Sequence, residues 1–227
     1  NLQEDRDEET RRLWITASLL AYYQQLRVFD GRAGELHRFR IEKPLWIFVG
    51  RTVKTVSSKE VSDIVDILSF FSDFVRPDGR PRAEASLARL LSATPGLHNE
   101  QGKEVLSGAF DDLRRLKVED AASLYEDVLR RVFNAPGGGK LHVSRLSEAD
   151  GEIAIRVGTA KEFAVVNVGD AKAVEDECRK DVARFAVEPR DVGDSLFAEV
   201  NKAGSPINVV IGAKKFTEGW NSWRVSS

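Results

Sequence analysis

Several features are missing from this chain of 227 residues, and each absence excludes a class of protein. A single cysteine, Cys178, rules out an internal disulfide and fits a reducing, cytoplasmic setting. No apolar run approaches the length of a membrane span, and the acidic first residues do not resemble a signal peptide. The formal net charge of -2 gives no overall attraction to nucleic acid, so any such binding must come from a local patch.

Methionine is also absent, and the sequence stops at Ser227 soon after its most distinctive stretch. We therefore expect the chain to be a fragment of a longer protein. The composition, with 42% hydrophobic and 31% charged residues, is that of a soluble globular protein. The length allows one large domain or two small ones.

The sequence gives little support for a metal site or for a hydrolase or nuclease active site. No metal site is expected, because one cysteine cannot form a zinc cluster and the histidines are far apart, at His37, His98 and His142. A Ser-His-Asp triad remains open, but no Gly-x-Ser-x-Gly elbow supports it. A nuclease could use Asp150 with Glu152, or Asp176 with Glu177. The first pair flanks a predicted turn and the second lies on a predicted helix, where carboxylates are usually solvated.

Short apolar runs predict the strands of a sheet. Three of them, at 45–49, 163–168 and 207–211, are followed directly by glycine and have the composition of buried strands. Two further segments, 141–146 and 152–157, alternate around Asp150-Gly151 and predict a β-hairpin. Strands separated by helical segments favour a mostly parallel α/β sheet.

Helical spacing predicts the elements between these strands. A helix with one buried side is expected from Glu8 to about Val28, followed by a loop over residues 30–43. Its expected inward residues are Leu13, Trp14, Ala17, Leu20, Ala21 and Val28. A second helix should start at a Ser57/Glu60 capping box and run to Val75.

Two more helices are expected late in the chain. Asp170 can cap one of them, and its predicted apolar face consists of Ala171, Val174, Cys178, Val182 and Phe185. Cys178 is accordingly interpreted as a core thiol. Asp194 can cap a short helix with Leu196, Phe197 and Val200 turned inward.

Residues 77–139 read as a helical insertion into the α/β core. Short helical patterns occur there, and Leu113, Leu116, Leu124, Val128 and Val132 are expected to cluster. The insertion ends in a glycine-rich run, residues 134–140, that is similar to a phosphate-binding loop. Leu141 stands where such a loop has Ser or Thr, and a strand pattern follows, so we predict a plain turn.

The stretch from Ile207 to Asn221 organises the chain. Polar residues directly follow the predicted buried strand at 207–211. The carboxyl ends of strands are where open α/β sheets bind ligands. The string Val-Ile-Gly-Ala-Lys-Lys-Phe-Thr-Glu-Gly-Trp-Asn-Ser-Trp-Arg-Val-Ser resembles motif V of superfamily 2 helicases, in the version of type III restriction enzyme subunits. Residues 45–50 resemble motif IV, and further similarity covers about 45–76 and 141–227.

This resemblance implies an α/β fold with a RecA-like, mostly parallel sheet flanked by helices, a helical insertion and a β-hairpin. The second motor domain would then consist of residues 1–76 and 140–227, with 77–139 inserted and motif VI lying beyond Ser227. The resemblance also implies that Glu218, Gly219 and Asn221 take part in ATP binding.

The resemblance also implies contacts to the nucleic-acid backbone at the ends of two strands. They are assigned to Gly50, Arg51, Gly212, Ala213, Lys214 and Lys215. Amides and cations at strand ends suit phosphates without reading sequence. The alternative interpretation of Lys214 and Lys215 is a solvated turn. Trp220 and Trp223 are read as core or interface aromatics.

The implied activity is that of an ATP-dependent DNA helicase or translocase that uses ATP and Mg²⁺ in the full-length parent. Its implied partners are DNA, the first RecA-like domain of the same parent chain and a modification methyltransferase subunit. This chain contains neither a phosphate loop nor an arginine motif, so we expect it to be inactive alone. The alternatives are a non-catalytic module that docks a partner subunit through its insertion and a stand-alone hydrolase, for which no active-site constellation was found.

Overall fold

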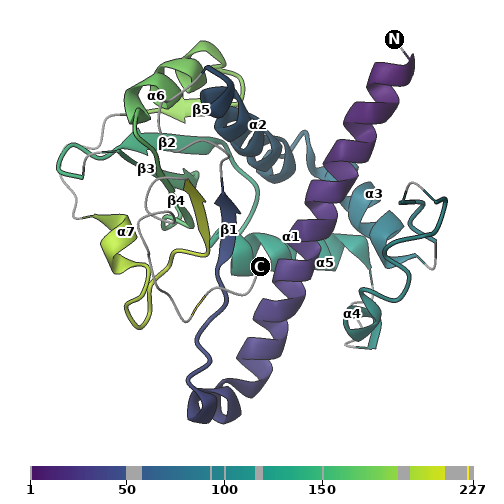
Figure 1. Ribbon diagram of the computed structural model, residues 1–227. Helices are drawn as coiled ribbons and strands as arrows, with labels where there is room; N and C mark the ends of the chain where they lie inside the picture. Colours follow the sequence, from purple (N-terminus) through teal and green to yellow (C-terminus); the bar gives the residue numbers. More distant parts are fainter. Residues whose placement is uncertain are drawn as a thin grey trace.

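A six-stranded sheet forms the centre of the fold (Figure 1). The structure is a computed structural model that describes residues 2–49, 58–92, 94–99, 101–115, 120–149, 151–188, 195–212 and 224. The strands are β1 (Trp46–Val49), β2 (Leu141–Arg145), β3 (Glu152–Val157), β4 (Ala164–Asn167), β5 (Phe185–Val187) and β6 (Val209–Gly212). Their order across the sheet is β1-β6-β4-β3-β2-β5.

The sheet is mostly parallel, as the sequence predicts. β6 pairs in parallel with β1 and β4, and β2 pairs in parallel with β5. β3 is antiparallel to both of its neighbours, β4 and β2, and the β2–β3 pair is the predicted hairpin. The α/β class is therefore confirmed, and the arrangement is consistent with a RecA-like fold.

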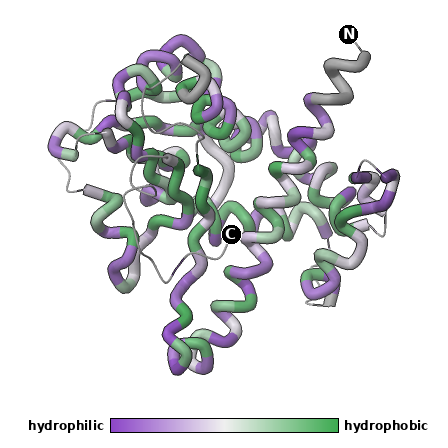
Figure 2. The backbone as a smooth tube through the Cα atoms, viewed as in Figure 1, coloured by the Kyte–Doolittle hydropathy of each residue, from purple (hydrophilic) through white to green (hydrophobic). Residues whose placement is uncertain are grey.

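The two faces of the sheet pack against different helices. Alternate residues such as Trp46, Val166 and Ile211 belong to the main core. This core also includes residues of the helices α1 (Leu2–Leu36), α2 (Ser58–Val75) and α6 (Ala171–Lys180). Their in-between neighbours on the second face, such as Val165 and Val210, pack against α7 (Leu196–Glu199). Figure 2 shows hydrophobic colour concentrated on the strands of the sheet.

The first helix, α1 (Leu2–Leu36), is longer than predicted and is buried on more than one side. It lies between the sheet and the insertion helices (Figure 1). The consecutive residues Leu19 and Leu20, and Tyr22 and Tyr23, are all fully buried. The predicted single buried stripe was therefore incomplete, and Trp14, at 39% exposure, and Val28, at 42%, do not belong to it.

The predicted loop over residues 30–43 was wrong in its first part. Residues 30–36 continue α1 with a kink at Arg32, and His37–Phe39 form a 3₁₀ turn, η1. The helix ends because Arg40 adopts a left-handed conformation, with φ of 56°, and the amide of Ile41 reaches back to the carbonyl of Leu36. Gly31 and Gly34, which suggested a loop, both lie within α1, and Gly31 is next to the kink at Arg32.

The insertion contains three described helices, α3 (Arg80–Leu91), α4 (Asp111–Arg115) and α5 (Ala121–Val132). The predicted cluster forms around Leu113, Leu124, Val128 and Val132, all fully buried, whereas Leu116 lies outside the described residues. These residues belong to the same core as α1, α2 and the first face of the sheet. The insertion thus shares its core with the α/β part of the chain.

Asp127 on α5 ties the insertion to α1. Its carboxylate accepts hydrogen bonds from the Tyr23 hydroxyl at 2.6 Å, from Arg27 at 3.0 Å and from Arg131 at 2.7 Å. Burial alone would raise the pKa of Asp127, but these hydrogen bonds and the charge of Arg131 outweigh it and hold the pKa below its usual range.

Changing Asp127 to asparagine should lower the free energy of unfolding by about 1–2 kcal/mol at pH 7. A carboxyl group whose pKa is depressed by folding stabilises above its unfolded pKa of about 4 and loses that effect as the pH falls through the folded value. The difference between the two proteins should therefore shrink in urea titrations below about pH 4.

Glu148→Gln is the control for this experiment. Glu148 is exposed and forms no ion pair with any residue that the structure describes. Its substitution should change stability by less than about 0.5 kcal/mol at either pH. A pH-independent difference for Asp127→Asn would contradict the assignment.

The glycine-rich run after α5 is a packed turn. A Cβ added at Gly138 would lie 2.7 Å from the carbonyl oxygen of Val75, and the amide of Gly139 donates to that same oxygen at 2.9 Å. Strand β2 follows, as predicted. The turn therefore holds the end of α2 against the start of the hairpin.

The helix after β4 ends earlier than predicted. Asp170 caps it by accepting from the amide of Ala173 at 2.9 Å, and Cys178 is buried, with its pKa raised to about 12 by burial. The helix stops at Lys180, so Val182 is 71% exposed and Phe185 starts the edge strand β5. The inclusion of the last two in the helical face was wrong.

Candidate functional site

Three neighbouring parallel strands end at the same level, at the carboxyl edge of the sheet. Val49 of β1 pairs with Gly212 of β6, and Gly212 pairs in turn with Asn167 of β4. Residues paired directly across strands lie on the same face, here the face that α7 covers. The end of the predicted motif IV strand and the end of the motif V strand are therefore direct neighbours.

Gly212 is the predicted site residue that the structure places. A Cβ at this position would lie 2.2 Å from the backbone oxygen of Asn167, so only glycine fits there without a shift of the strands. The other predicted contacts lie outside the described residues; they are Gly50, Arg51, Ala213, Lys214, Lys215, Glu218, Gly219 and Asn221. Trp220 and Trp223, and the predicted helix caps Ser57 and Asp194, lie outside them as well.

Glu152 lies beside this row and is buried, which corrects the expectation of a solvated carboxylate. It pairs with Asn167 across β3 and β4 and is only 2% exposed. Its two oxygens accept from the Ser195 hydroxyl at 2.6 Å and from the Phe197 amide at 3.1 Å. Glu152 thus fixes the first turn of α7 over the second face.

Asn167 differs from the buried Asn208 and from the partly buried Asn134. Asn208 donates to the carbonyls of Arg131 and Val132, and Asn134 donates to those of Glu162 and Pro206. The side chain of Asn167 is 4% exposed and has no hydrogen bond within the part of the chain that the structure describes. Sequence reasoning missed Asn167, although a lone asparagine inside an apolar strand was a usable signal.

Arg224 is a second residue that sequence reasoning did not single out. Its guanidinium donates to the carbonyls of Lys43 at 2.9 Å and Ile207 at 2.7 Å, and also to that of Val200. Its own carbonyl accepts from the amide of Leu45 at 2.7 Å. Lys43 and Ile207 precede β1 and β6, so Arg224 lies at the amino edge of the sheet, opposite Gly212.

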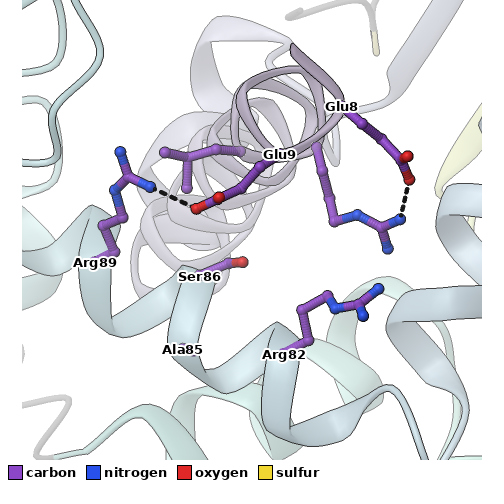
Figure 3. Close-up of a pocket in the computed structure, with 8 residues that line it drawn as sticks. Glu8, Glu9, Arg82, Ala85, Ser86 and Arg89 are labelled. Carbon is purple, nitrogen blue, oxygen red and sulfur yellow. Dashed lines mark hydrogen bonds and ion pairs between the residues drawn. The ribbon is translucent and has the colours of Figure 1, made fainter. Parts of the chain in front are cut away.

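A separate groove of about 400 Å³ lies between α1 and α3 (Figure 3). Glu9 pairs with Arg89 across it at 3.0 Å, and Glu8 pairs with Arg12 at 3.1 Å. Arg82 points into it and forms no ion pair within the described ranges. Charges of both signs line the groove, which has no constellation for a reaction.

No group of three or more His, Cys, Asp or Glu suited to a metal ion occurs among the described residues. Within the same ranges, no helix is long and apolar enough to cross a membrane. Comparisons with protein-family models, with curated proteins and with solved structures found no match.

Proposed function

We propose that this chain is part of the second motor domain of an ATP-dependent DNA helicase or translocase, of the type III restriction enzyme kind. The observation that supports this most directly is the pairing of Val49 with Gly212. Of the two segments that resemble nucleic-acid contacts of such motors, one begins directly after Val49 and the other begins at Gly212. Both start from one point of the carboxyl edge, where parallel α/β sheets bind their ligands.

Within this proposal, the chain contributes phosphate contacts from strand ends and one wall of an ATP cleft. Lys214 and Lys215 supply cations close to the end of β6, and Gly219 and Asn221 approach the nucleotide further along. ATP and Mg²⁺ would be held jointly with the first RecA-like domain of the parent chain. A modification methyltransferase subunit is the implied external partner.

The pure chain should bind single-stranded DNA weakly and without preference for sequence. Its dissociation constant should rise steeply with salt, because only backbone phosphates are contacted. Fluorescence anisotropy with two labelled oligonucleotides of different sequence, at low and moderate salt, measures this. Binding that is independent of salt, or DNA-stimulated ATP turnover by the chain alone, would contradict the proposal.

Charge reversal at Lys214 sharpens this experiment. Lys214→Glu should weaken binding and reduce the salt slope by about one unit, because one phosphate contact is lost. Gly219→Val should leave DNA affinity nearly unchanged, since that position is assigned to the ATP cleft. Lys103→Glu, on an exposed loop of the insertion, is the matched charge control and should change neither quantity.

The second candidate, a module that docks a partner subunit through its insertion, rests on the groove between α1 and α3. Arg82, which has no ion-pair partner among the described residues, faces that groove together with Ser86. On this alternative, Arg82→Glu would abolish partner binding and leave DNA binding intact.

A further inference from the structure

The segment that joins α1 to β1 projects beyond the sheet (Figure 1). This tip, residues 32–43, contains the last turn of α1, the turn η1 and the chain that leads to β1. All of its residues are exposed except Leu36 and Lys43, which are partly buried. Strand β1 begins shortly after it, at Trp46, so the tip lies at the amino edge of the sheet. It is therefore separate from the strand ends at the carboxyl edge.

Phe39, at the tip, is the most exposed large hydrophobic residue among those that the structure describes. The residue is 75% exposed, and Ile41, two positions later, is 45% exposed. Within the described part of the chain, the Phe39 ring makes no contact with another aromatic ring. A planar apolar ring is thus presented to solvent on a projection of the molecule, where a ligand has access to it.

Cations surround this ring. The tip contains four Arg or Lys and only two Glu, in a chain whose formal net charge is -2. Arg32, Arg38 and Arg40 are exposed, and none of them forms an ion pair with any residue that the structure describes. Arg38 and Arg40 flank Phe39 directly in the sequence. The tip is therefore a local positive patch with an aromatic ring at its centre.

Arg40 occupies a backbone position that glycine adopts more easily. Its φ is 56°, its amide donates to the carbonyl of His37, and the amide of Ile41 donates to that of Leu36. Helix ends with this pattern usually have glycine at the left-handed position. The other described non-glycine residue with positive φ is Asn134, whose side chain holds two carbonyls. The Arg40 side chain has no hydrogen bond within the described ranges, so its backbone cost favours a role in binding.

We infer that the tip binds single-stranded nucleic acid, with an unpaired base stacked on the Phe39 ring and the adjacent phosphates held by Arg38 and Arg40. Proteins that bind single strands combine cations along the backbone with aromatic rings on which bases stack. Arginine suits this task, because its planar guanidinium binds phosphate through two parallel hydrogen bonds. The inference goes beyond the proposed function, because the tip is at the opposite edge of the sheet from Gly212.

Two other anionic partners fit the tip less well. A membrane surface requires more apolar area, since even one fatty acyl chain gives only marginal binding and a single ring is smaller. An acidic protein offers carboxylates to the arginines but no regular series of planar rings to Phe39. A single strand supplies both, because each phosphate is followed by a base.

Phe39→Ala tests the stacking contact. It should weaken binding of a labelled single-stranded oligonucleotide by the full chain about tenfold, with an unchanged salt slope, because no charge is removed. Binding of a duplex of the same length should change much less, since its bases are already stacked. Val182→Ala, at a side chain that is 71% exposed, is the matched control and should leave both affinities unchanged.

Arg40→Gly tests the phosphate contact and separates it from a structural role. Binding of the single strand should weaken, and the salt slope should fall by about 0.7, the value for one phosphate of a single strand. The urea midpoint should stay the same or rise, because glycine adopts the left-handed conformation without strain. Lys103→Gln, on an exposed loop of the insertion, is the charge control and should change neither the affinity nor the slope.

Unchanged single-strand affinity in either tip variant would overturn the inference and leave the proposed function standing. Equal weakening of single-strand and duplex binding in Phe39→Ala would also overturn it, since stacking needs an unpaired base. So would binding to phosphatidylserine vesicles that Phe39→Ala abolishes while oligonucleotide binding persists. If the unaltered chain binds no oligonucleotide even at low salt, the inference and the proposed function both fail.

Discussion

Replacing Arg224 with methionine should lower the free energy of unfolding by about 3 kcal/mol or more. The guanidinium satisfies the carbonyls of Lys43, Val200 and Ile207, which come from three separate segments. Methionine fills a similar volume but leaves those three oxygens without this donor. Burial lowers the pKa of Arg224, so the hydrogen bonds also offset the cost of placing a cation there.

Urea denaturation of Arg224→Met, Arg224→Lys and Arg82→Met separates geometry from charge. Lysine keeps the charge but cannot present donors in the planar fork that reaches three carbonyls, so it should recover less than half of the loss. Arg82 is exposed and forms no ion pair within the described ranges, so its substitution should cost less than about 0.5 kcal/mol. Wild-type stability in Arg224→Lys would contradict the role of the fork.

Replacing Phe71 with alanine should cost about 3–5 kcal/mol, the range typical of a fully buried aromatic residue. Phe71 on α2 is completely buried. The centroid of its ring is 5.7–6.0 Å from the centroids of five other aromatic rings. Those rings belong to Trp46, Phe48, Phe70, Phe133 and Phe163. The cavity would open where α2, the end of α5 and strands β1 and β4 meet.

The loss of stability in Phe71→Ala should appear as a lower midpoint of urea unfolding. The slope of the unfolding free energy against urea concentration should be unchanged. Phe71→Leu provides a milder variant if the alanine protein is already unfolded without urea. Val182→Ala, at a side chain that is 71% exposed, is the control and should be nearly neutral. A change below about 1 kcal/mol for Phe71→Ala would show that the aromatic cluster repacks around the gap.

The strands were predictable where a continuous apolar run was followed directly by glycine, as at 45–49 and 207–211. β5 was not, because it has only three residues and Phe185 stands seven positions after Cys178, a spacing that also fits a helix. Periodicity cannot distinguish the two for so short a segment. The pairing partner, β2, is known only once the hairpin is folded.

The extent of burial on α1 also depended on information that the sequence does not carry locally. A single stripe describes a helix with one neighbour, whereas Tyr22 stacks on Trp46 of β1 and the adjacent Tyr23 donates to Asp127 of α5. At the candidate site, the strand end at Gly212 was predictable from composition. The row that it forms with Val49 and Asn167 required the strand order, which no local pattern specifies.

The position of β6 has a consequence for synthesis of the protein on the ribosome. β6 is the last described strand to be made, yet it sits between β1 and β4, which are completed about 160 and 40 residues earlier. Until β6 emerges, each of those two strands has an edge without its β6 partner. Chaperone dependence and aggregation of shortened translation products should therefore change abruptly once residue 212 has left the tunnel.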